Sequence, residues 1–181
     1  MRVVSGRARG IKLNTIDSLK TRPTTDRVKE AIFSMIQFDL QDAVVLDAYA
    51  GSGALGIEAL SRGAAQVDFV DLAKPCIKVI KDNLAKTKLI GGAVFQSALD
   101  DFLKSGRAKT YDIVLLDPPY QKKYVEKSIN WLIEGDNLSK NAIIVVEHNN
   151  SIQLAERYGT LARAKDKRYG AIFITIYRRE M

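Results

Sequence analysis

A doubly wound α/β domain is the fold that this sequence of 181 residues predicts, and three observations predict it. Five short apolar runs, rich in β-branched residues, lack polar alternation. Such runs suit parallel strands that are covered on both faces. Helical patterns separate the runs, and a glycine-rich turn follows the first of them. Strand–helix alternation with right-handed crossovers then gives a mostly parallel sheet with helices on both sides.

The amino-terminal residues 1–40 are expected to form an extension that packs on a domain of residues 41–181. Residues 2–15 alternate β-forming residues with Arg, Lys and Gly, which predicts a short hairpin. In "RPTTDRVKEAIFSMI", Thr24 or Thr25 can cap a helix whose apolar residues recur at helical spacing.

The rest of the chain supplies the sheet and its covering helices. Strands are expected at 43–48, 66–72, 92–97, 111–117 and 141–148, and helices at 54–62, 74–88, 98–105, 122–133 and 151–157. The segment "GTLARAKDKRYGAIFITIYRR" has two strand-like runs joined by a charged turn, which predicts a terminal antiparallel hairpin. The expected sheet therefore has seven strands.

Charge and composition narrow the class of protein. The formal net charge is +7, and residues 1–30 and 157–181 each carry an excess of five positive charges around a mildly acidic middle. Two basic ends suit contact with a polyanion, although solubility explains basicity equally well. One cysteine and one histidine argue against disulfides and a metal centre. Because no apolar run approaches the roughly 20 residues of a membrane span, we expect a cytoplasmic protein with no membrane partner.

The first candidate site is the turn "LDAYAGSGALG". Its glycines, Gly51, Gly53 and Gly56, fit the G-x-G-x-x-G pattern that holds dinucleotides. Asp47 precedes them at the strand end, where a carboxylate would repel a pyrophosphate. A cationic ligand without phosphate, such as S-adenosylmethionine, makes this carboxylate useful. Asp71 ends the next strand and suits the hydroxyls of a ribose, which both kinds of ligand carry. After the third strand, residues 97–99 are placed to meet an adenine.

The second candidate site is "LLDPPY", at the end of the fourth strand. Asp117 and the carbonyl of Pro118 are acceptors on a stiff turn, next to the aromatic face of Tyr120. A planar base with an exocyclic amino group is complementary to this set, since both amino hydrogens find acceptors and the ring can stack. Catalysis would then rest on orientation and electrostatics.

With these pieces the sequence resembles the Rossmann-like, S-adenosylmethionine-dependent amino-methyltransferases and, more narrowly, the RsmD family, which methylates guanine N2 in bacterial 16S rRNA. The resemblance covers nearly the whole chain, through "RVVSGRARGIKL", "RPTTDRVKEAIF", "LDAYAGSGALGIEALSRGA", "LLDPPY" and "YGAIFITIYRR". It implies the class I methyltransferase fold. Asp71 replaces the Glu commonly seen in the family, and the shorter acid can still reach a ribose.

The resemblance also implies roles for individual residues. Those expected to bind the cofactor are Asp47, Tyr49, Gly51, Gly53, Asp71, Ala98, Leu99, Arg22 and Thr24. Those expected to hold the target base are Asp117, Pro118 and Tyr120. Those expected to contact RNA phosphates are Arg2, Arg7, Arg9, Lys12, Lys122 and Lys123. The implied partner is 16S rRNA in the 30S subunit or an assembly intermediate, approached by a monomer that holds no metal.

Three other functions fit parts of the sequence. A DNA methyltransferase acting on adenine N6 or cytosine N4 can use D-P-P-Y equally well, although the chain lacks a sizeable target-recognition segment. A dinucleotide-dependent oxidoreductase fits the bare glycine pattern. A non-catalytic RNA-binding protein fits the basic ends.

Overall fold

The computed structural model describes residues 1–16, 25–118 and 122–180. Its strands are β1 (Val44–Ala48), β2 (Gln66–Asp71), β3 (Gly92–Gln96), β4 (Tyr111–Leu116), β5 (Leu138–Asn149), β6 (Arg157–Tyr158), β7 (Leu161–Tyr169) and β8 (Ile172–Arg179). Its helices are α1 (Asp26–Met35), α2 (Ala54–Ser61), α3 (Lys74–Thr87), α4 (Leu99–Lys104) and α5 (Lys122–Glu134).

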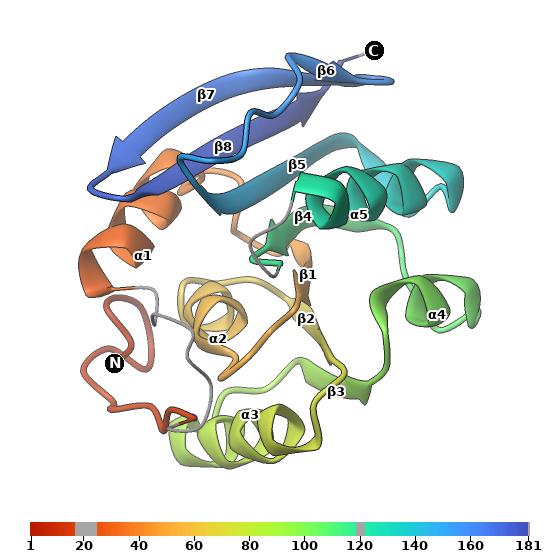
Figure 1. The fold of residues 1–181 in the computed structure, drawn as a ribbon. Helices are drawn as coiled ribbons and strands as arrows, with labels where there is room; N and C mark the ends of the chain where they lie inside the picture. The colour runs from red at the N-terminus through yellow and green to blue at the C-terminus, as the bar shows by residue number, and fades with distance from the viewer. Residues whose placement is uncertain (17–24, 119–121, 181) are drawn as a thin grey trace.

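All of these strands join one sheet, in the order β3-β2-β1-β4-β5-β8-β7-β6 (Figure 1). The neighbours from β3 to β5 pair in parallel, and β8 pairs antiparallel with both β5 and β7. The strand order reverses between β1 and β4. In open α/β sheets a ligand binds at this reversal, beyond the carboxyl ends of the strands. The expected fold class, with its terminal antiparallel hairpin, is confirmed.

Apolar side chains on both faces of the sheet explain why the central strands read as unbroken hydrophobic runs. One face packs against α1, α2 and α3, which contribute Ile32, Ile57 and Ile80 to the core. The other face packs against α4 and α5, which contribute Phe102 and Ile129. Figure 1 shows α1, α2 and α3 on one side of the sheet and α4 and α5 on the other.

The first sixteen residues pack on α1 and α2 and share their core. Val3 and Leu13 are buried in the same apolar cluster as the two helices. Glu58 of α2 is fully buried and accepts hydrogen bonds from the backbone amides of residues 4–5, at 2.8 and 2.9 Å. It also pairs with buried Lys29 of α1 at 3.2 Å. Because the core is shared, a domain boundary after residue 40 stays a prediction.

Two expectations about the amino-terminal segment have clear outcomes. The hairpin expected over residues 2–15 is reduced to a single antiparallel bridge between Arg2 and Lys12. Helix α1 begins directly after Thr25, whose hydroxyl oxygen accepts a hydrogen bond from the amide of Val28 at 3.3 Å. This is the side-chain cap that the sequence predicts.

The helix expected over residues 151–157 is wrong. The Asn149 side chain accepts a hydrogen bond from the Ser151 amide at 3.1 Å, which favours a turn over a helix. Ile152 and Leu154 are both buried, a spacing of two that suits extended chain. This segment leads into the two-residue strand β6, which pairs with β7, so the described sheet has eight strands rather than seven.

Candidate active site

Carboxyl side chains gather at the edge where the strand order reverses. Asp47 lies near the end of β1, Asp71 ends β2, Asp117 follows β4 directly, and Glu147 lies near the end of β5. Because β1, β2, β4 and β5 are parallel neighbours, their carboxyl ends meet at one edge of the sheet. The structure therefore brings together the two acids of the glycine site and the acid of the D-P-P-Y turn.

The turn between β1 and α2 has an unusual backbone. Its φ angles are +61° at Tyr49, +55° at Gly51 and +76° at Gly53. A left-handed conformation costs a residue with a side chain roughly 1–2 kcal/mol. Tyr49 is held in it by a hydrogen bond between its hydroxyl and that of Ser128 in α5, at 2.9 Å. Such held strain is typical of functional turns, and the glycines allow close approach of a ligand to the backbone.

Asp47 lies beneath this turn and supports it. One of its carboxylate oxygens accepts a hydrogen bond from the amide of Gly56 at 2.9 Å, and the residue is only 3% exposed. Burial raises the pKa of Asp47 to about 8, and the nearby charge of Asp71 adds to the rise. The hydrogen bond from Gly56 opposes it. A positive charge on a ligand at the rim would stabilise the ionised carboxylate.

Asp71 connects the ends of β1 and β2. Its two oxygens accept hydrogen bonds from the amides of Gly51, at 2.9 Å, and Ala73, at 2.8 Å. Each carboxylate oxygen has a second lone pair, so Asp71 can hold the glycine turn and still accept hydroxyl groups of a ligand. Its role in binding a ribose stays a prediction.

Asp117 and Glu147 occupy adjacent positions on neighbouring strands. Leu116 pairs with Val146 in the parallel register, so the residues that follow them come next to one another. Burial raises the pKa of Asp117 well above its usual value, and the charges of Glu147 and Asp47 raise it further. Glu147 was not among the residues predicted from the sequence. Its signal was a single acid directly after the buried apolar run at residues 142–146.

The end of β3 and the residue after β2 complete the rim. Ala98 precedes the first residue of α4, and the Leu99 side chain is buried in the core. Leu99 can therefore offer a ligand at the rim its backbone amide rather than its side chain. Leu72, which follows Asp71, is 69% exposed. This apolar residue was not among those predicted from the sequence.

Several expected site residues lie outside the described part of the chain. These are Arg22, Thr24 and Tyr120, so their predicted roles stay predictions. Pro118 is described and buried, directly after Asp117. The side chain of Lys122, the first residue of α5, also lies outside the description.

The remaining basic residues of the expected RNA surface differ in their contacts. Arg2 forms an exposed ion pair with Asp26 at 2.9 Å. The Arg7 guanidinium donates a hydrogen bond to the backbone oxygen of Leu60 at 3.3 Å, and Arg7 is still exposed. Arg9 and Lys12 are exposed, and the Lys123 ammonium lies 5.4 Å from the centre of the Tyr124 ring. The role of these residues in binding RNA stays a prediction.

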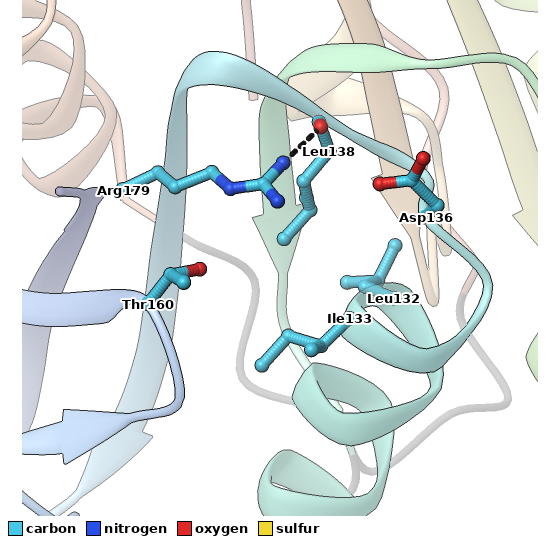
Figure 2. A pocket seen from close by; sticks show the side chains of 6 residues that line it. All are labelled: Leu132, Ile133, Asp136, Leu138, Thr160 and Arg179. Carbon is cyan, nitrogen blue, oxygen red and sulfur yellow. Dashed lines mark hydrogen bonds between the residues drawn. The ribbon is translucent and has the colours of Figure 1, made fainter. Parts of the chain in front are cut away.

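A small pocket lies far from the carboxyl rim (Figure 2). It is lined by residues at the end of α5, the start of β5 and the end of β8, and Arg179 donates a hydrogen bond to the backbone oxygen of Leu138 there. Its empty volume of about 160 Å³ includes open solvent, so the enclosed space is too small for a cofactor. It also lies at the amino end of β5, opposite the rim.

No helix in the described part of the chain is long and apolar enough to cross a membrane. In the same part of the chain, no cluster of three or more His, Cys, Asp or Glu is placed to hold a metal ion.

The open sheet, the strained glycine turn and the acidic rim together define a Rossmann-like methyltransferase. A solved structure titled "Putative methyltransferase yhhF from Escherichia coli" is 35% identical, with a TM-score of 0.87 over 99% of this chain and 98% of that one. The family model described as "Conserved hypothetical protein 95" matches residues 1–178. The chain belongs to this family, the RsmD family, which confirms the resemblance drawn from the sequence.

Two relatives are named for an activity. "Putative rRNA methyltransferase YlbH" of Bacillus subtilis is 36% identical over 99% of both chains. "Ribosomal RNA small subunit methyltransferase D" of Escherichia coli is 35% identical over 99% of this chain and 90% of its own length.

Proposed function

We propose that this protein transfers a methyl group from S-adenosylmethionine to the exocyclic N2 of a guanine in bacterial 16S rRNA. One observation carries the proposal: Asp47 and Asp117 lie close together at the same edge of the sheet. Asp47 lies beneath the glycine turn, and Asp117 directly follows β4. One acid belongs to the cofactor side of the rim and the other to the base side. Methyl transfer from a cationic cofactor to the amino group of a base needs both acids at one edge of the sheet.

The electrostatics of the rim favour S-adenosylmethionine over a dinucleotide. The charge of Asp71 raises the pKa of Asp47, and the charges of Glu147 and Asp47 raise that of Asp117, so further negative charge is costly at this rim and a pyrophosphate would add to that cost. S-adenosylmethionine carries a sulfonium and an ammonium, and when bound it supplies an electrophilic methyl group. The residues that would hold it are Asp47, Gly51, Gly53 and Asp71, with exposed Leu72 available to cover the adenine.

The target base would lie over the D-P-P-Y turn. Asp117 and the carbonyl of Pro118 accept the two amino hydrogens, which fixes the amino group and directs the nitrogen lone pair away from the ring. Tyr120 stacks on the base. When the nitrogen gains its new bond it must lose a proton. The ionised carboxylate of Asp117 would stabilise the positive charge that develops on the nitrogen and would then accept that proton.

The names of the relatives support rRNA over DNA as the substrate, because both matches extend over nearly the whole chain. RNA recognition of this kind requires a guanine that is splayed out of its stack, with basic side chains holding the backbone on either side. We propose 16S rRNA within the small subunit or an assembly intermediate as the substrate, modified in the cytoplasm by a monomer.

The experiment that tests this proposal uses labelled S-adenosylmethionine and small subunits from a strain that lacks the enzyme. We expect label in 16S rRNA, recovered after digestion as N2-methylguanosine. Small subunits from the parent strain are the control, because their target is already methylated. Absence of label in 16S rRNA, with duplex DNA labelled instead, would refute the proposal.

A further inference from the structure

Strand β7 presents a row of basic side chains to solvent. Residues 163–168 contain four basic residues and one acid, and residues 164–168 are exposed. Strand β6 pairs only with Leu161 and Ala162, so β7 is the edge of the described sheet beyond them. In Figure 1, β7 and β8 form a long hairpin, and α1 lies between this hairpin and the amino-terminal segment.

The strand register places two of these residues on the face that carries the acidic rim. Glu147 pairs with Ile174, which in turn pairs with Lys167. Residues opposite one another in a sheet project from the same face. Lys167 is therefore two strands from Glu147, about 10 Å away at a strand spacing of about 4.8 Å.

Lys165 belongs to the same face. It pairs with Ile176, which pairs with Val145 of β5, so its row lies two residues along the strand from the row of Lys167. Ile174 and Ile176 are core residues of the α1 face, so the two lysines continue that face to the edge of the sheet.

The other charged residues of this strand are engaged within the protein. Asp166 accepts a hydrogen bond from the Thr175 hydroxyl at 3.0 Å. Arg168 donates to the backbone oxygen of Gly170 at 2.8 Å and lies over the Phe173 ring. Among the described residues, the side chains of Lys165 and Lys167 have no ion-pair or hydrogen-bond partner. Their charges are available to a ligand.

We propose that Lys165 and Lys167 bind phosphates of the RNA strand next to the target guanine. The inference rests on the proposed function and adds a second contact surface, on the opposite side of α1 from the amino-terminal segment. A guanine held at Asp117, one strand beyond Glu147, lies about 14 Å from Lys167, or three strand spacings, so the phosphates that flank it come within reach of the long lysine side chains. Lysine contacts of this kind give salt-dependent affinity and carry no base sequence.

The same lysines also suit a purely structural role, because charged side chains on an edge strand prevent sheets from pairing edge to edge. The two roles differ in what neutralising the lysines changes. An RNA contact changes the affinity for RNA and its salt dependence. A role in keeping edges apart changes only the tendency to self-associate.

The test compares Lys165→Gln/Lys167→Gln with Lys78→Gln/Lys81→Gln, which removes the same charge from the exposed side of α3. RNA affinity is measured by fluorescence anisotropy at several salt concentrations, with labelled fragments of 16S rRNA. Calorimetry with S-adenosylhomocysteine confirms that each variant is folded. We expect the β7 variant to bind RNA severalfold more weakly, with a salt slope smaller by about 1.4, or about 0.7 per lost phosphate contact.

Three results would overturn the inference. The first is equal RNA affinity and salt slope in the two double variants. The second is a β7 variant that self-associates, by light scattering, while its monomer binds RNA like the wild type. The third is a wild-type protein that binds S-adenosylhomocysteine but no RNA. This result would overturn the proposed function as well. Lys165→Arg/Lys167→Arg keeps the charge, and we expect it to bind RNA like the wild type.

Discussion

The carboxylate of Asp47 accepts a hydrogen bond from the backbone amide of Gly56 at 2.9 Å, which ties the end of β1 to the first turn of α2. A Cβ atom at Gly56 would lie 2.9 Å from that carboxylate oxygen and 2.3 Å from the Phe69 ring. Gly51 and Gly53 shape the turn, whereas Gly56 lets the helix approach the sheet. The third glycine would therefore act on the proposed cofactor site by holding Asp47 and α2 together.

Replacement of Gly56 by alanine should destabilise both the fold and the site. The added methyl group overpacks the contact with Phe69, which costs about 1–3 kcal/mol of unfolding free energy in urea titrations. We expect weaker binding of S-adenosylhomocysteine as well, because α2 must move away from Asp47. Gly106→Ala is the control, since no atom lies within 4 Å of its Cβ and only backbone strain is added. Wild-type stability and affinity in Gly56→Ala would contradict this account.

Protonation of Asp47 should link cofactor binding to pH. The pKa of Asp47 is about 8 in the folded protein and about 3.9 in the unfolded chain. The folded state therefore holds the proton more tightly, and the stability that this proton contributes below about pH 4 is lost as the pH rises through about 8. A cationic cofactor favours the ionised carboxylate, so binding at pH 7 should release about one proton.

Calorimetry in buffers of different ionisation enthalpy measures this release directly. We expect the affinity for S-adenosylmethionine to rise between pH 6 and pH 8 in the wild-type protein. Asp47→Asn should bind more weakly and lose this pH dependence. Equal proton release by the wild type and Asp47→Asn would show that another group titrates.

Glu147 should set the pH range over which Asp117 works. The charge of Glu147 raises the pKa of Asp117, so its removal in Glu147→Gln should lower that pKa. We expect the acidic limb of the profile of kcat/KM against pH to move to lower pH, with the maximum retained within about tenfold. A merely structural role would lower activity at every pH and leave the limb in place. Glu126→Gln, on the outer helix α5, is the control and should leave the limb unchanged.

The cofactor half of the site was the more predictable from sequence. A parallel strand must end at the edge where its neighbours end, so Asp47 and Asp71 could be placed together from strand order alone. What the spacing could not show was that Asp47 is buried beneath the turn and bonded to Gly56. That contact depends on how closely α2 packs on β1, which is a tertiary property.

The base-binding half of the site and the segment after β5 were harder to predict from the sequence. Glu147 is one acid in an apolar run, and only the pairing of β5 with β4 brings it beside Asp117. The helix expected over 151–157 is absent because the Asn149 side chain and the burial of Ile152 and Leu154 favour a turn and extended chain. Local helical pattern was overridden there by side-chain bonding to the backbone and by packing against the sheet.

The central claim is that Asp117 holds the amino group of a guanine in 16S rRNA for methyl transfer. Mass spectrometry of 16S rRNA, from cells that lack this protein and carry either the wild type or Asp117→Ala, tests it most directly. Calorimetry should show that Asp117→Ala is folded and still binds S-adenosylhomocysteine. The account predicts one N2-methylguanosine that is restored by the wild type and absent with Asp117→Ala. Identical N2-methylguanosine content in the two strains would contradict it.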